Sequence, residues 1–206
     1  LININLGADF VATLPGEGRR PGLEVYGELL IDDAQGTISN RDSVPDFLGG
    51  LVGVRVPQFT SDPRFSAYFE YVAISSYVYS HRNPDNNYVY RGTVIGHSLG
   101  PDADMWAVAA GFRPDSQTIA SLLGAVVRHG ESEIGHPWSP AEGRYREFPS
   151  GIAERTVKAS LEMERTLREP VLIAGRLELG TTFNKGHVQG STCTYWRAAA
   201  ALGVRL

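Results

Sequence analysis

Cysteine, long apolar runs and basic clusters are all scarce in this sequence. Cys193 is the one cysteine in 206 residues, so an internal disulfide framework cannot hold the fold. No segment reaches the ~18 apolar residues of a membrane-spanning helix, which excludes a helical membrane protein but not a barrel. The net charge is -4 and no stretch concentrates Lys and Arg, so we expect no nucleic-acid partner. No Cys/His cluster indicates a metal site, and we expect no cofactor.

Alternation of apolar and polar residues is what the sequence has instead, and it predicts about nine strands. In residues 152–164, apolar side chains alternate with Glu, Lys, Thr and Ser; a helix would scatter these charges around its circumference, whereas a strand sorts them. The two faces of 118–129 cannot be told apart by this pattern. The predicted strands are 2–14, 23–32, 47–57, 65–80, 104–112, 118–129, 152–164, 171–183 and 193–206.

Connection lengths between these strands alternate. Most strands are near the ~9–11 residues that a tilted membrane-crossing strand needs, and short turns on one side with long loops on the other are typical of an outer-membrane barrel. The short turns lie near 15–22, 58–64, 113–117 and 165–170, and the longer loops near 33–46, 81–103, 130–150 and 184–192.

We therefore predict an all-β fold, an antiparallel transmembrane β-barrel of the bacterial outer membrane. Residues 1–206 would form one barrel domain or the carboxy-terminal part of one, because the odd strand count indicates part of a larger barrel. The start at Leu1, without Met or signal peptide, indicates a mature protein or a fragment. The alternative is a soluble β-sandwich or lipocalin-like barrel, since alternation alone does not say which face is inside.

Charged side chains on the polar side of the last three strands would face the barrel lumen and pair across strands. These predicted lumen charges are Glu154, Lys158, Glu162, Arg176, Glu178 and Arg197.

The segment Gly96-His97-Ser98-Leu99-Gly100 matches G-x-S-x-G, the nucleophile elbow of lipases and esterases. That elbow needs a strand before it, a helix after it, and an acid and a histidine further along. Pro101 follows directly and no apolar stripe with helical spacing comes next, so a hydrolase is the least favoured interpretation. Candidate acids are Asp102, Asp104 and Asp115, and candidate bases are His129, His136 and His187.

The longer segment Tyr88–Ala103 resembles the Wzi family of capsule assembly proteins, in which a Y-R-G…I-G-H-x-x-G-x-D-A pattern lies in the carboxy-terminal half. The resemblance is firm over about twenty residues. It implies an outer-membrane barrel of about eighteen strands with a lectin-like, non-enzymatic role in attaching capsular polysaccharide to the cell surface. The matching residues are Tyr90, Arg91, Gly92, Ile95, Gly96, His97, Gly100, Asp102 and Ala103.

The expected function is therefore binding or anchoring of surface polysaccharide, with an outer-membrane channel as the alternative. Expected partners are the polysaccharide, outer-membrane lipid or lipopolysaccharide, and other envelope proteins. Asp102 has two possible roles, a structural one in the loop, capping a turn or pairing with Arg91, or direct sugar contact. Candidate carbohydrate-binding residues are Tyr88, Tyr90, Arg91, His97 and Asp102.

Overall fold

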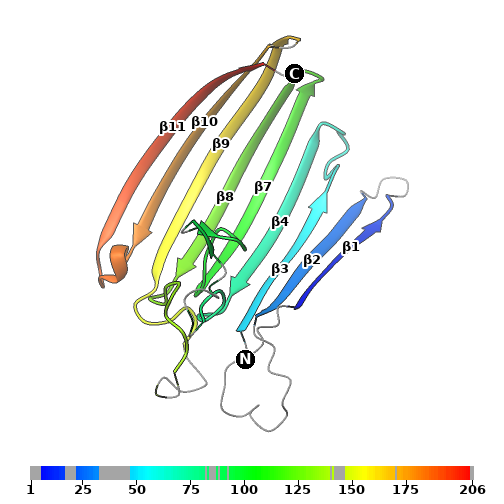
Figure 1. Cartoon of the computed structure of the whole chain (residues 1–206). Coiled ribbons are helices and arrows are strands. Elements are labelled where there is room, and N and C mark those ends of the chain that lie inside the picture. The colour runs from blue at the N-terminus through cyan, green and yellow to red at the C-terminus, as the bar shows by residue number, and fades with distance from the viewer. Residues whose placement is uncertain are drawn as a thin grey trace.

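A computed structural model of the chain describes residues 6–16, 22–32, 47–81, 83, 87, 89–91, 93–139, 141, 147–169 and 171–204. Nine strands form one antiparallel sheet in the order β1-β2-β3-β4-β7-β8-β9-β10-β11, and Figure 1 shows them side by side in that order. The strands are β1 Leu6–Leu14, β2 Leu23–Asp32, β3 Phe47–Val56, β4 Phe65–Ile74, β7 Ala103–Asp115, β8 Thr118–His129, β9 Glu154–Arg168, β10 Val171–Phe183 and β11 Thr192–Val204.

The smaller elements lie in the connections. Strands β5 (Val89–Tyr90) and β6 (Thr93–Val94) pair as a short hairpin between β4 and β7, and a 3-10 helix, Lys185–His187, lies between β10 and β11. Within the described ranges, no helix is long and apolar enough to cross a membrane. In Figure 1, the described parts of the connections 75–102, 130–153 and 184–191 lie at the lower end of the sheet, and the short turns 57–64 and 116–117 lie at the upper end. The predicted asymmetry of connection lengths is confirmed for the connections that the structure describes.

The prediction of an all-β antiparallel fold with nine strands is confirmed. The sheet is open across the described residues, with β1 and β11 as its two edges. Three predicted boundaries were wrong. The strand predicted for 152–164 continues to Arg168, so the turn predicted near 165–170 is shorter. The strand predicted for 65–80 ends at Ile74, because residues 75–80 turn over one face of the sheet. The turn predicted near 113–117 is shorter, because β7 continues to Asp115. A register irregularity between Phe112 and Asp115 accommodates Pro114, which has no N–H to donate.

The strand register sorts the side chains into two faces, because residues directly opposite each other on neighbouring strands share a face. Leu179 lies opposite Ala159 and Trp196, which defines the apolar face, whereas Glu178 lies opposite Ser160 and Arg197, which defines the polar face. Strand β8, whose faces the sequence did not separate, places Leu122 opposite Leu161 on the apolar face and Ser121 opposite Glu162 on the polar face.

The core of the molecule lies on the polar face, at the end of the sheet with the longer connections. Here the inward positions are apolar, because the connection after β4 covers them. Val72 and Ile74 are each 1% exposed beneath Tyr77, Val78 and Tyr79. Partly buried side chains complete this core: Leu30, Leu51, Val94, Leu99 and Met105. The polar face is therefore polar only where no connection packs on it.

Candidate functional site

Asp102 is the residue that holds the connections together. Its carboxylate is 0% exposed and its backbone has a left-handed φ of 57°. One oxygen accepts hydrogen bonds from the Ser76 hydroxyl at 2.8 Å and the Ser150 N–H at 3.0 Å. The other accepts hydrogen bonds from the Ser132 N–H at 3.0 Å and from the Ser150 hydroxyl. A buried carboxylate needs several hydrogen-bond donors of this kind, because burying one without partners is strongly unfavourable.

The backbone of Asp102 makes further hydrogen bonds to the same segments, and we call this whole set of contacts the Asp102 clamp. The Asp102 N–H donates to the Ser75 carbonyl at 3.2 Å, and the Asp102 carbonyl accepts from the Gly130 N–H at 2.8 Å. Asp102 therefore ties the segment after β4 to the segments that follow β8 and precede β9. Direct sugar contact by this carboxylate would break bonds that it already makes. Its described partners are serines and backbone N–H groups, whereas Arg91 stacks on Tyr90.

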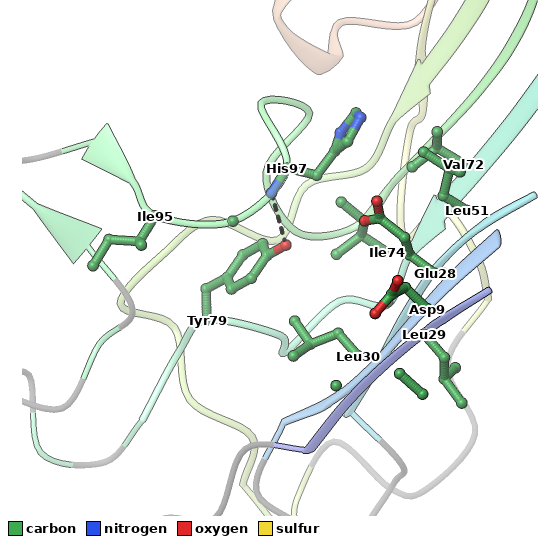
Figure 2. A pocket seen from close by; sticks show the side chains of 15 residues that line it. Asp9, Glu28, Leu29, Leu30, Leu51, Val72, Ile74, Tyr79, Ile95 and His97 are labelled. Atoms are coloured by element: carbon green, nitrogen blue, oxygen red, sulfur yellow. Dashed lines mark hydrogen bonds between the residues drawn. The ribbon is translucent and has the colours of Figure 1, made fainter. Parts of the chain in front are cut away.

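A cavity of about 690 Å³ lies between the clamped connection and the polar face of β1–β4. Figure 2 shows Tyr79 and His97 contributed by the connection, and Asp9 and Glu28 contributed by the sheet. Asp9 and Glu28 lie directly opposite each other on β1 and β2. Apolar walls come from Leu30, Leu51, Val72, Ile74 and Ile95.

The polar groups of this cavity offer both donors and acceptors. The His97 N–H donates to the Tyr79 hydroxyl at 3.1 Å, and the Leu99 N–H donates to His97 Nδ1 at 3.2 Å. Because Nδ1 is an acceptor, a neutral His97 carries its hydrogen on Nε2, where it can donate. Ionised Asp9 and Glu28 carboxylates can accept hydrogen bonds from a ligand. Apolar walls with a few polar groups are typical of sites for small uncharged or weakly charged ligands, sugars among them.

The structure places the predicted carbohydrate-binding residues in different surroundings. His97 lines the cavity. Tyr90 is 66% exposed on β5, and the Arg91 guanidinium lies 5.4 Å from its ring centre, so both are on the outer side of the connection. Tyr88 lies outside the described residues. Asp9, Glu28 and Tyr79 are cavity residues that the sequence reasoning did not select.

The six predicted lumen charges share the polar face, and five of them make polar contacts there. Arg176 lies 2.8 Å from Glu178 and 3.3 Å from Glu162, and Arg197 lies 3.8 Å from Glu178. Glu178 is 5% exposed and also accepts a hydrogen bond from the Tyr195 hydroxyl at 3.2 Å. Glu154 accepts from the Gly186 N–H at 2.7 Å, which fixes the β10–β11 connection. Lys158 lies opposite Gly180 on the same face.

The nucleophile-elbow interpretation lacks its structural context. Residues 95–102 form bends and turns that lead directly into strand β7, where an elbow would lead into a helix. Ser98 is exposed, Asp102 is committed to its serine partners, and Asp104 pairs with Arg128. His187 Nδ1 contacts the Ile152 carbonyl at 2.9 Å. In the part of the chain that is described, no group of three or more potential ligands gathers to hold a metal ion.

The fold and this site define an all-β protein in which a clamped connection packs on the polar face of an antiparallel sheet and forms one wall of an open cavity. The chain belongs to the family of capsule assembly protein Wzi, whose family model matches residues 4–162. The predicted resemblance is confirmed over most of the chain. Comparisons with curated proteins and with solved structures gave no match.

Proposed function

We propose that this chain forms part of an outer-membrane β-barrel that holds capsular polysaccharide at the cell surface without chemical conversion. The single observation that carries the membrane placement is the apolar face of β9. On that face, Arg155 and Arg165 lie at the two ends of a run of four apolar residues: Val157, Ala159, Leu161 and Met163. Ten residues at about 3.3 Å each span about 33 Å along the strand. With a strand tilt of about 40°, the height is about 25 Å, the usual height of a barrel's apolar band.

Exposure of the apolar face supports the same placement. Leu161 is 52% exposed, Leu179 55%, Trp196 70% and Leu202 75%. A continuous exposed apolar surface of this kind is unfavourable in water and favourable against lipid. Aromatic rings lie toward both ends of the strands, with Tyr71 on Trp106 at 4.1 Å at one end and Phe65 on Phe112 at 4.6 Å at the other. In a membrane the sheet edges β1 and β11 must be paired, and we propose that further strands of a larger barrel pair with them.

Membership of a capsule assembly family and the cavity beside His97 support the polysaccharide role. With the longer connections outside the cell, the cavity opens among the segments that meet the polymer first. His97 donates and Asp9 and Glu28 accept, which suits the hydroxyl groups of a sugar. Tyr79 and Ile95 supply the surfaces on which a sugar ring can pack.

Substitution at Glu28 tests this role. Glu28→Gln removes a charged acceptor from the cavity and keeps the side-chain shape, so cells should retain about tenfold less polysaccharide per molecule of protein. Glu24→Gln is the matched control, because Glu24 lies on the same strand and face but pairs with Arg55 outside the cavity. The measurement compares cell-bound with released polysaccharide at equal protein level. Equal retention by both variants would contradict the cavity as the binding site.

An outer-membrane channel is the second candidate, and the ion-paired polar face of β9–β11 favours it. Arg176 and Glu178 would then face the water-filled lumen and set ion selectivity. Arg176→Gln should shift the reversal potential of single-channel currents toward cation selectivity. If no current is measured from the purified protein in planar bilayers, the channel alternative fails and polysaccharide binding is unaffected.

A further inference from the structure

A row of side chains crosses the apolar face at the end of the sheet with the longer connections. Asp104 on β7 lies opposite Arg128 on β8, Arg128 lies opposite Arg155 on β9, and Arg155 lies opposite Phe183 on β10. Directly opposed residues share a face, so two arginine side chains start from neighbouring positions at the boundary of the apolar band. Like charges directly opposite each other destabilise a sheet. A bound anion would offset this repulsion.

Arg128 is held in a fixed orientation. Its Nε donates to one Asp104 oxygen at 2.9 Å, and a terminal nitrogen donates to the other at 2.5 Å. Asp104 is 0% exposed and also accepts from the Tyr71 hydroxyl at 3.2 Å. A guanidinium has five N–H groups, so this geometry leaves most of them for another acceptor. The Arg128 side chain is 41% exposed, so these groups remain accessible.

Arg155 is oriented differently. Its guanidinium carbon lies 5.0 Å from the centre of the Phe183 ring, which holds the side chain against the sheet. Within the described part of the chain, Arg155 has no ion pair with a carboxylate. The row therefore contains two cations and one carboxylate, and one positive charge remains uncompensated at this edge of the apolar band.

We propose that Arg128 and Arg155 bind the phosphate of a phosphorylated glycolipid in the outer leaflet, of the lipid A type. This inference rests on the membrane placement proposed above. Arg groups bind phosphate oxygens in a planar, bidentate manner, and the pair lies where a headgroup would meet the apolar band. The acyl chains would lie along the next residues on the same face, where Trp106, Val126 and Val157 form one transverse row.

A nearby apolar groove favours an acylated ligand over free phosphate. The groove has a volume of about 460 Å³ and lies on the same face over Gly50 and Ala73. Ala73 lies opposite Asp104 and Gly50 lies opposite Ala73, so the groove continues the row that contains the two arginines. Its walls are Leu29, Leu48, Val52, Tyr71 and Phe148. A lipid with several acyl chains can contact both the arginines and this groove.

The test measures lipid retained by the purified protein, using native mass spectrometry after incubation with phosphorylated lipid A, dephosphorylated lipid A or phosphatidylglycerol. The protein should retain phosphorylated lipid A best, and Arg155→Gln should weaken that retention about fivefold to tenfold. Arg165→Gln is the matched control, since it removes the same charge from the same face of β9 at the opposite end. Excess inorganic phosphate should not displace the lipid.

Three results would overturn the proposal. They are equal retention of phosphorylated and dephosphorylated lipid A, an equal loss in Arg155→Gln and Arg165→Gln, and stronger retention of phosphatidylglycerol. In each of these cases the membrane barrel itself would stand. If the protein and both variants do not insert into lipid vesicles, the proposed membrane placement fails together with the lipid site.

Discussion

Asp102 and Ser150 lie 48 residues apart in the sequence and are joined by two hydrogen bonds, one from the Ser150 N–H at 3.0 Å and one from its hydroxyl. The pair connects the segment before β7 to the segment before β9. Because Asp102 also binds Ser76 and Ser132, one side chain determines how the β4–β7 and β8–β9 connections meet. The cavity beside His97 depends on this arrangement, since its outer wall is one of those connections.

Asp102→Asn tests the clamp. An amide keeps one acceptor oxygen but presents an NH₂ group to donors, which leaves buried N–H groups unpaired. We expect a loss of about 2–4 kcal/mol in stability of the connections. Limited proteolysis should then cut residues 75–102 and 130–150 faster, while the strands keep their β-sheet circular dichroism. Protease resistance equal to that of the unsubstituted protein would mean that the clamp does not hold these segments.

Gly130→Ala tests the same clamp from its other side. A Cβ at Gly130 would overlap the Asp102 carboxylate and lie 2.5 Å from the Ser150 nitrogen, so the connections must shift. The matched control is Gly124→Ala within β8, the strand that ends just before Gly130, where the nearest atom is a Val108 methyl at an ordinary 3.7 Å. Thermal unfolding in detergent should show a lower midpoint for Gly130→Ala than for Gly124→Ala. Equal midpoints would show that the connections move apart without penalty.

Ser98→Ala addresses the hydrolase interpretation. The serine is exposed on a turn and removal of its hydroxyl should change neither folding nor polysaccharide retention. A nucleophile would behave otherwise, because removal of a triad member typically lowers kcat by several orders of magnitude. Hydrolysis of a short-chain ester is the measurement. Ester hydrolysis by the protein that disappears in Ser98→Ala would contradict the non-enzymatic role.

The sequence predicts the sheet well because alternation is a local property of each strand. The facing of Glu162, Arg176 and Glu178 follows from that alternation and is confirmed by the register. The same pattern gave a wrong prediction for residues 75–80, which are not part of a strand. Tyr77 and Tyr79 alternate with Ser and Val as a strand would, but they are buried because they pack over Val72 and Ile74.

The site is harder to predict because its members come from separate connections. The serines that bind Asp102 share no spacing or motif, and only the folded chain brings them together. Asp9 and Glu28 are different. Once the hairpin pairs Leu14 with Leu23, counting five residues away from the turn on each strand places Asp9 opposite Glu28. Their pairing was therefore predictable from the sequence. The missing step was the position of Tyr79 and His97 above them.

Cysteine labelling tests the proposed orientation. In a Cys193→Ser background, Gln189→Cys lies in the connection between β10 and β11, and Ser116→Cys lies in the short turn between β7 and β8. If the longer connections face outward, an impermeant maleimide should label Gln189→Cys on intact cells and label Ser116→Cys only after lysis. The opposite pattern would place the cavity and the arginine pair on the periplasmic side.

The facing of the sheet gives the last prediction. Ala159 lies near the middle of the apolar band on β9, between Arg155 and Arg165, so Ala159→Arg should destabilise the protein in lipid by about 2–4 kcal/mol. Ser160 is an unsuitable control although it lies on the polar face, because it is only 3% exposed and an arginine would not fit there. Ser121 is the better control, since it is half-buried on the polar face opposite Glu162 and an arginine there gains an acidic neighbour. Urea titration of each variant refolded into vesicles measures the difference. If lipid covers the apolar face, Ala159→Arg should lose far more stability than Ser121→Arg. Equal losses would mean that the apolar face does not contact lipid.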